Sequence, residues 1–568
     1  MALRLAYHAS AFLTLVTLTF LLFWVLPGDP ARLQLGLHAD EASVARLRHA
    51  LGLDRPLWVQ YGDFLWNTLR LRLGHSMESG EPVVLLLQEH FRVTGPLSLL
   101  GLGLAASLSL LMAEALRLRG RVADLIEGIR LVMTSMPVLF SGLLLAFIFG
   151  YVWPLFPLSG PVEWRRLFLP AVTIALGPAA VLARVLRESI EEVEAQPYIL
   201  TARAFGLPEG RIRLYILRNA LTAWTAALSN QAAVLLTGAF LVENIFSLPG
   251  MGWLAVRAIF QRDLPVLQGI VLWNGTIVIL VHLVTDVAYR LLNPGPPVLV
   301  RDHPEKSRWQ PVAVALAAFI VLSFLALKIA PYSPVRIEAT PLRPPSSDPL
   351  FGTDDLGRDV FSRTLHGLHR TLRISLAALG LSLTLGVAVG AWAGFHHGRW
   401  PDRVVSWWTS VLIALPSLLL LMGVITVVEP GTTGAYLALS AVLWVIPARI
   451  VRGEVVRLRT AAFVEAERVL GVPTARVVFG TVLPIAFRPA LVASLALLAE
   501  LIGLEAGLAF LGLGVQPPEP SLGKMIFDGL SFLGTAWWTS IPPAAVLFGL
   551  VLAVNGVGSW TASPRRLR

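Results

Sequence analysis

Cysteine is absent from the 568-residue chain, and charged residues make up only 14% of it. Without cysteine the chain holds no disulfide, no thiolate zinc site, no cysteine-ligated iron–sulfur cluster and no cysteine nucleophile. An average soluble domain carries about 25% charged residues. Because 55% of this chain is hydrophobic, too few polar side chains remain to cover a soluble fold. The sequence therefore predicts a surface that mostly faces lipid.

Lysine is rare as well: it occurs only at positions 306, 328 and 524, so arginine supplies nearly all the positive charge. The net charge is +10, which in a nucleic-acid-binding protein would form a basic patch on a polar domain. Here the arginines lie in short segments between apolar runs, an arrangement typical of cytoplasmic loops of membrane proteins. The expected partner is a lipid bilayer and not a nucleic acid.

Recognisable catalytic and nucleotide-binding motifs are also missing. The closest match to a phosphate-binding loop, LGKM at 522–525, lacks the spacing and the hydroxyl residue of that motif. No Ser/His/Asp arrangement or carboxylate pair can be placed, so an intramembrane enzyme is not expected, nor is a cofactor or metal on this chain. The stretch GTDDLGRDVF (352–361) lacks the alternating spacing of a calcium loop. A capped helix leading into the next apolar run is expected there.

Twelve apolar runs approach the length of about 20 residues that crosses a bilayer as a helix. The first is interpreted as an uncleaved span, because no small-x-small cleavage site follows it. Placing the arginine-rich segments inside puts both termini in the cytoplasm. The expected spans are 9–26, 93–115, 131–153, 167–186, 222–244 and 267–291, followed by 311–330, 372–394, 405–427, 433–451, 488–510 and 539–557.

Two pairs of segments repeat between the halves. YILTARAFGLPEGRIRLYILRNAL (198–221) and FVEAERVLGVPTARVVFGTVLPIAF (463–487) align at Gly206 and Gly471, with one residue less in the first copy before LRNAL. ENIFSLPGMG (243–252) and EAGLAFLGLG (505–514) align at Glu243 and Glu505. Each pair falls at the same place in its half, before and at the end of the fifth span. Two units of the same orientation form a parallel repeat.

The repeat predicts an all-α polytopic membrane protein with two six-helix units. The expected division is a first unit at 1–292, a cytoplasmic linker rich in proline and charge at 293–310, and a second unit at 311–568. In each repeated loop a short helix would end at the glycine, which takes a left-handed conformation, and the proline two residues later suits the start of the next helix. Such a turn, present twice, favours a docking element over a solvated hairpin.

At these residues the chain resembles the permeases of ABC importers, whose loop before the fifth span carries Glu-Ala-Ala, three residues and Gly. Leu483-Pro484 also fits that pattern. TARAFGL, LRNAL and LPGDPA (26–31) resemble B-type permeases of the dipeptide/oligopeptide/nickel branch, and FGTDDLGRDVFSRTLHG (351–367) resembles the C-type. The resemblance covers nearly the whole chain and implies a natural fusion of both permeases with the type I importer fold. The implied coupling residues are Thr201, Ala202, Arg203, Ala204, Gly206, Leu207 and Pro208, and Glu465, Ala466, Glu467, Gly471, Val472 and Pro473.

The resemblance further implies a permease that forms the pathway for peptides, nickel chelates or a related small solute in the inner membrane. Two separate ATPase subunits, which hold ATP and Mg, and an extracytoplasmic binding protein are the implied partners. Intramembrane carboxylates mark pathways by default, so Glu243 and Glu505 are candidate pathway residues. The alternative is an ion-coupled secondary transporter with a parallel six-plus-six repeat, which would use carboxylates such as Asp286 and Glu500.

Overall fold

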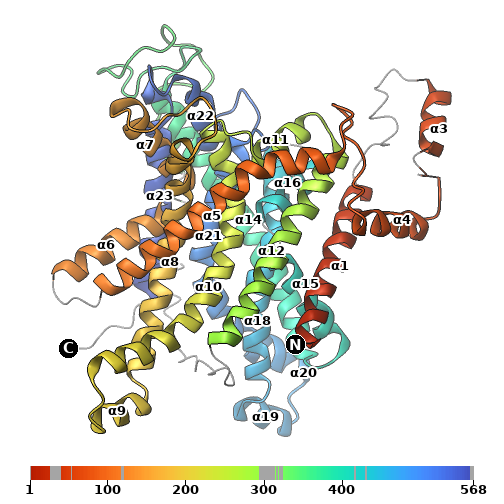
Figure 1. The fold of residues 1–568 in the computed structure, drawn as a ribbon, viewed down its shortest axis with the longest axis vertical. Helices are drawn as coiled ribbons and strands as arrows, with labels where there is room; N and C mark the ends of the chain where they lie inside the picture. The colour runs from red at the N-terminus through yellow and green to blue at the C-terminus, as the bar shows by residue number, and fades with distance from the viewer. Residues whose placement is uncertain are drawn as a thin grey trace. The chain divides into compact units, whose positions relative to one another are not determined.

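Helices make up most of the part of the chain that the computed structural model describes (Figure 1). The described residues are 2–25, 40–50, 52, 54–116, 121–292, 314, 317–318, 321, 324–414, 417–428 and 431–562. Within them no strand occurs, and the only extended pairings are two isolated bridges, His75 with Pro82 and Thr353 with Asp359. The predicted all-α class is confirmed.

The chain folds into two compact units. Unit 1 comprises Met1–Thr134, Leu155–Pro296 and Ala414–Val427. Its longest helices, α5, α8, α10 and α12, pack directly against one another, because small and apolar residues line their facing sides. The helices of unit 1 are α1 (Ala2–Val25), α3 (Glu41–Ala50), α4 (Leu57–Leu69), α5 (Val83–Ala115), α6 (Arg121–Ser135), α8 (Trp164–Glu194), α9 (Pro197–Ala204), α10 (Glu209–Ile245), α11 (Met251–Phe260), α12 (Leu264–Leu292) and α16 (Ser417–Val428).

Unit 2 comprises Ser135–Pro154, Pro297–Ile413 and Val428–Arg568. Here α14 packs along α18 and α21. Its helices are α7 (Val138–Ala146), α14 (Val360–Phe395), α15 (Trp400–Ala414), α17 (Thr432–Leu443), α18 (Val445–Leu458), α19 (Ala462–Val469), α20 (Thr474–Arg476), α21 (Leu483–Phe510), α22 (Leu522–Gly529) and α23 (Ile541–Ala562), with π-helices η1 (Phe147–Val152) and η2 (Val477–Val482) and 3-10 turns η3 (Leu530–Phe532) and η4 (Trp537–Thr539).

Membrane-spanning helices occur where the apolar runs predict them. Within the described residues, eight helices are long and apolar enough to cross a bilayer, and up to ten if each of two bent pairs counts as one span. These overlap ten of the predicted spans. The first predicted span appears as the shorter apolar helix His8–Leu21, and the span predicted at 311–330 lies largely outside the described residues. The chain is a multi-pass membrane protein.

Two of the predicted spans are broken, which corrects the prediction of continuous helices at 131–153 and 405–427. The first bends by 105° between Ser135 and Val138. Pro137 lies there in an extended conformation, and proline disfavours the helical conformation of the residue before it. The second bends by 97° between Ile413 and Ser417, at Pro416 in the sequence. Both breaks fall in the third predicted span of their half, so they extend the repeat.

The compact units differ from the two sequence halves, because each takes up a segment from the other half at these breaks. Segment 135–154 belongs to unit 2, where the Phe140 ring stacks on Phe548 with centroids 4.9 Å apart and Asn555 donates to the Ser135 hydroxyl at 3.3 Å. Segment 414–427 belongs to unit 1. The division at 1–292, 293–310 and 311–568 stays a prediction of the repeat boundaries, and 293–310 lies outside the described residues.

Candidate functional site

The first repeated loop joins α8 to α10 through α9, and α9 ends in a glycine turn (Figure 1). Gly206 has a φ of +70°. The N–H of Leu207 donates to the Ala202 carbonyl at 3.2 Å, and the N–H of Gly206 donates to the Arg203 carbonyl at 2.9 Å. These two bonds form a Schellman motif, which places a left-handed residue just after the helix. Extended Pro208 then begins α10.

The second loop has the same backbone geometry. Gly471 has a φ of +78°. The N–H of Val472 donates to the Glu467 carbonyl at 3.0 Å, and the N–H of Gly471 donates to the Arg468 carbonyl at 3.1 Å. Pro473 begins α20 as Pro208 begins α10. The predicted helix, glycine turn and second helix are therefore confirmed in both copies.

A buried aliphatic side chain anchors each short helix. Ile199 and Val464 both lie seven residues before the turn glycine, and they are 1% and 0% exposed. Ile199 packs in a cluster with Ile212 and Ile216. Val464 packs in the matching cluster of unit 2, on the last turns of α18 and the start of the next span. The signal that could predict these anchors is an aliphatic residue at the same position, seven residues before the glycine, in both copies.

Each turn also carries an exposed apolar side chain, called the tip residue below. Phe205 is 80% exposed and Leu470 is 81% exposed, and each directly precedes its turn glycine. Tyr198, on α9, is also exposed, and its partial burial raises the pKa of the phenol. A large side chain at a matched, rigid tip is an anchor of the kind that binding partners cover.

The polar surroundings of the two loops differ. In the first, Leu200, Thr201 and Ala202 occupy the places of Glu465, Ala466 and Glu467. Arg203 Nε lies 3.3 Å from Glu209 Oε1, within the loop. In the second, the Thr481 hydroxyl donates to Glu467 Oε1 at 2.9 Å. The two turns therefore share one backbone shape and carry different charges.

A π-helix accounts for the extra residue of the second copy. In α10, the buried residues Ile212, Ile216 and Ala220 follow one another at intervals of four. Their counterparts are Val477, Val482 and Ala486, with five residues in the first interval. That interval is the π-helix η2 (Val477–Val482). A π turn accommodates one inserted residue, so the buried face stays in register on both sides of it.

Glu243 is 0% exposed and caps the helix that follows its span. It accepts hydrogen bonds from the Thr94 hydroxyl at 2.5 Å and the Gly252 N–H at 2.6 Å. The N–H of Met251 donates to the Thr94 hydroxyl at 2.8 Å. A Cβ on Gly250 would overlap the Glu243 carboxylate. Together these groups fix the N-terminus of α11 against α5.

Glu505 is also 0% exposed, but its surroundings differ. Within the described residues no backbone N–H donates to its carboxylate. Thr371 is the twelfth residue of α14, as Thr94 is of α5, and its hydroxyl lies beside the Glu505 carboxylate. The connection from α21 to α22 spans residues 511–521, whereas the connection from α10 to α11 spans only 246–250. In the longer connection, Ser521 caps α22. A pathway role of Glu243 and Glu505 stays a prediction.

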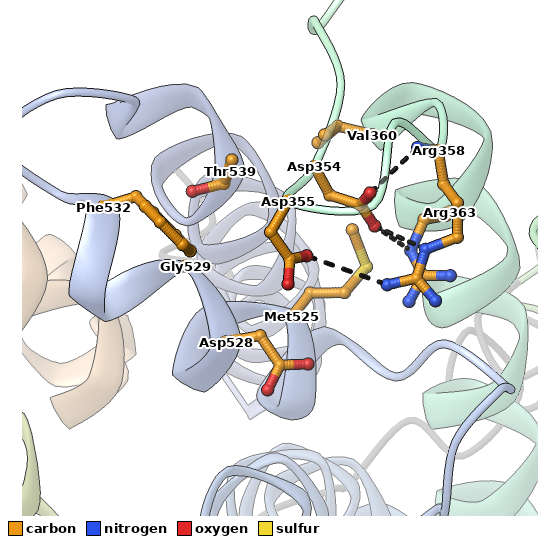
Figure 2. Close-up of a pocket in the computed structure, with 10 residues that line it drawn as sticks. All are labelled: Asp354, Asp355, Arg358, Val360, Arg363, Met525, Asp528, Gly529, Phe532 and Thr539. Carbon is orange, nitrogen blue, oxygen red and sulfur yellow. Dashed lines mark hydrogen bonds and ion pairs between the residues drawn. The ribbon is translucent and has the colours of Figure 1, made fainter. Parts of the chain in front are cut away.

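The stretch GTDDLGRDVF forms a loop held by an acid–arginine cluster (Figure 2). Asp354 Oδ2 lies 2.7 Å from Arg358 Nε and 3.4 Å from Arg363 Nε, and Asp359 caps α14 by accepting from the Ser362 N–H at 2.7 Å. The predicted capped helix is confirmed. The cavity beside the cluster, about 20 Å³, has room for about one water molecule. Within the described residues no group of three or more metal-ligating side chains occurs.

Comparison with known proteins finds the same family domain twice in the chain. The family described as binding-protein-dependent transport system inner membrane component matches residues 105–296 and again 386–562, and its N-terminal companion family matches 2–97. A putative peptide transport system permease protein of Brucella suis biovar 1 (strain 1330) is 35% identical over 302 residues. The dipeptide transport system permease protein DppB of Escherichia coli (strain K12) is 32% identical over 330 residues. Each alignment covers 51% of this chain and 96% of the relative.

Proposed function

Because the chain belongs to the family of binding-protein-dependent transport system inner membrane components, with the family domain present twice, we propose that it is the fused permease of an ATP-driven importer of short peptides. Short peptides are the proposed substrate because the relatives that align with half of the chain are named as peptide and dipeptide transport permeases. Nickel chelates or a related small solute belong to the wider class that the sequence resemblance implies. The observation that carries the proposal is the matched pair of turns at Gly206 and Gly471.

In this proposal the coupling loops 201–208 and 465–473 dock on two separate ATPase subunits, which hold ATP and Mg. The buried side chain of each short helix, Ile199 or Val464, packs against the unit. The exposed tip residue, Phe205 or Leu470, faces the ATPase subunit. Because a Schellman turn and a packed cluster hold the loop, a push on the tip moves the attached spans instead of bending the loop. The different charges of the loops fit either two different ATPases or two identical ones.

The proposed assembly places the chain in the inner membrane with both termini in the cytoplasm. The loops on the other side then meet an extracytoplasmic binding protein that delivers the substrate. The arginine-rich segments support this orientation, because short cytoplasmic loops concentrate arginine.

The test is affinity purification of the tagged chain from its own host in mild detergent, followed by mass spectrometry and by uptake measurements in proteoliposomes. We expect ATPase subunits to be recovered with the chain and to be lost when Gly206 and Gly471 are both replaced by tryptophan. Purification without ATPases, together with uptake driven by an ion gradient alone, would contradict the proposal.

That second result would favour the ion-coupled secondary transporter. One observation supports it as an alternative: the carboxyl group of Glu505 is buried in a candidate span, where no backbone N–H within the described residues donates to it. Buried intramembrane carboxylates serve as ion and proton sites in such transporters. Uptake that persists without ATP and fails in Glu505→Gln would establish this function.

A further inference from the structure

A cavity of about 350 Å³ lies inside unit 1, apart from the coupling loops. It opens to the surface and is lined by the hairpin at 75–82, by α5, by α11 and by the first turn of α12. Its volume falls in the range of about 300–1,000 Å³ that small-molecule sites occupy. The hairpin belongs to the loop 27–92, which the predicted topology places outside the cell.

Some charges around the cavity are already compensated within the protein. Arg257 Nη2 lies 2.7 Å from Glu78 Oε1, and Gln261 donates to the same carboxylate. Asp263 accepts from the Ser76 hydroxyl and, at 3.4 Å, from the Glu78 N–H. These bonds hold the hairpin against α11 and α12, so they build the wall of the cavity and leave little charge for a ligand.

Two carboxylates on the cavity wall are not compensated. Glu81 and Glu89 both line it and are exposed. Their carboxylates have no ion pair or hydrogen bond within the described residues. With four carboxylates and one guanidinium in the lining, and histidine neutral, the cavity carries an excess of three negative charges, which raises the local concentration of cations.

His90 adds an acceptor of a different kind. The residue is 9% exposed, and its Nδ1 lies 2.8 Å from the Leu86 carbonyl oxygen. A carbonyl only accepts, so Nδ1 carries the proton and Nε2 of the neutral ring has a free lone pair. Nε2 has no partner within the part of the chain that the structure describes. The ring stacks on Trp253 at 5.8 Å, which fixes its orientation.

We propose that this cavity binds the amino-terminal ammonium group of a short peptide. Glu81 and Glu89 supply the opposite charge, and His90 Nε2 accepts one of the three N–H donors. Trp253, Leu254 and Leu86 form the apolar wall against which a side chain of the peptide packs. The inference deepens the proposed function and rests on it for the choice of peptides, while the arrangement of acceptors selects a primary ammonium group in any case.

The test is equilibrium dialysis of radiolabelled trialanine, and of its N-acetylated form, against the full chain in lipid nanodiscs without ATP or binding protein. We expect the free amine to bind at least tenfold more tightly than the acetylated peptide. Glu81→Gln combined with Glu89→Gln should weaken trialanine binding at least tenfold and leave the acetylated form unchanged. His90→Phe, which keeps an aromatic ring on Trp253, should weaken it severalfold. Glu163→Gln, at an exposed position outside the cavity, is the matched control and should bind normally.

Equal binding of both peptides, or normal trialanine binding by the double variant, would overturn the inference. Loss of binding-protein capture by the double variant, with trialanine binding intact, would also overturn it, because the cavity would then be a protein contact. Failure of the proposed function is a separate result. It would appear as wild-type proteoliposomes that show no ATP-driven uptake while amine-dependent binding in nanodiscs remains.

Discussion

Replacing Gly471 by alanine tests whether the left-handed turn is what presents the coupling tip. Nothing lies within 4 Å of a Cβ built at this position, so the change brings no clash and acts only through the backbone. Its φ of +78° costs a residue other than glycine about 1–2 kcal/mol. That free energy lowers the ratio of native to non-native turn by a factor of roughly 5–30. We expect the affinity for the ATPase subunits to fall by up to the same factor.

The matched control is Gly453→Ala. Gly453 is exposed on α18 and also has no neighbour within 4 Å, but its φ is not positive. In a helix this change stabilises by about 0.5–1 kcal/mol, so ATPase affinity should not fall. The assay is titration of purified ATPase subunits onto each variant in detergent, together with peptide-dependent ATP hydrolysis in proteoliposomes. Equal losses in the two variants would refute the reasoning, and so would normal affinity in Gly471→Ala.

Three further predictions concern named contacts. Phe205→Ser or Leu470→Ser should weaken ATPase capture by tenfold or more without lowering the melting temperature, because each removes about 1.5–3 kcal/mol of apolar burial that forms only on docking. Thr94→Val should destabilise the chain by about 1–3 kcal/mol in denaturation, because a buried carboxylate and an N–H both lose a partner, whereas Thr371→Val should cost less, because no backbone N–H of the described residues donates to Thr371. Asp359→Ala should cost about 1 kcal/mol through loss of the cap of α14, measured the same way.

The sequence predicted the spans and the two turns, because both depend on local signals. A run of apolar residues is a helix in lipid regardless of its neighbours, and a glycine followed two residues later by proline ends one helix and begins another. The breaks near Pro137 and Pro416 were missed although proline was visible in the sequence. Within a long apolar run proline is tolerated or breaks the helix according to packing, and packing is not a local property.

The hydrogen-bond partners of the two buried glutamates could not be predicted from the sequence, for a different reason. Glu243 and Glu505 match in sequence position, yet within the described residues only Glu243 accepts a hydrogen bond from a backbone N–H of the next helix. The difference comes from the connection that follows each span, at 246–250 and at 511–521. Its length decides where the next helix begins and therefore which carboxylate finds backbone donors. A match of residue types does not contain that information.

The π-helix η2 carries the last prediction. Val477 and Val482 are both buried, five residues apart, and the inserted residue between them would rotate the buried face of an α-helix by about 100°. Deleting exposed Gly480 restores the spacing of four that Ile212 and Ile216 have in α10. We expect the deletion variant to fold, to keep its melting temperature and to retain ATPase capture.

The control is deletion of Ala493, which lies in the regular part of α21. With no π turn to absorb the change, everything on one side of the deletion rotates by about 100° relative to the other, and buried positions such as Ser494 and Leu495 turn away from their partners. This variant should lose stability by several kcal/mol or fail to fold, since several core side chains leave the interior at once. If both deletions proved equally harmful in thermal denaturation, η2 would be a required part of the coupling loop and not an accommodated insertion.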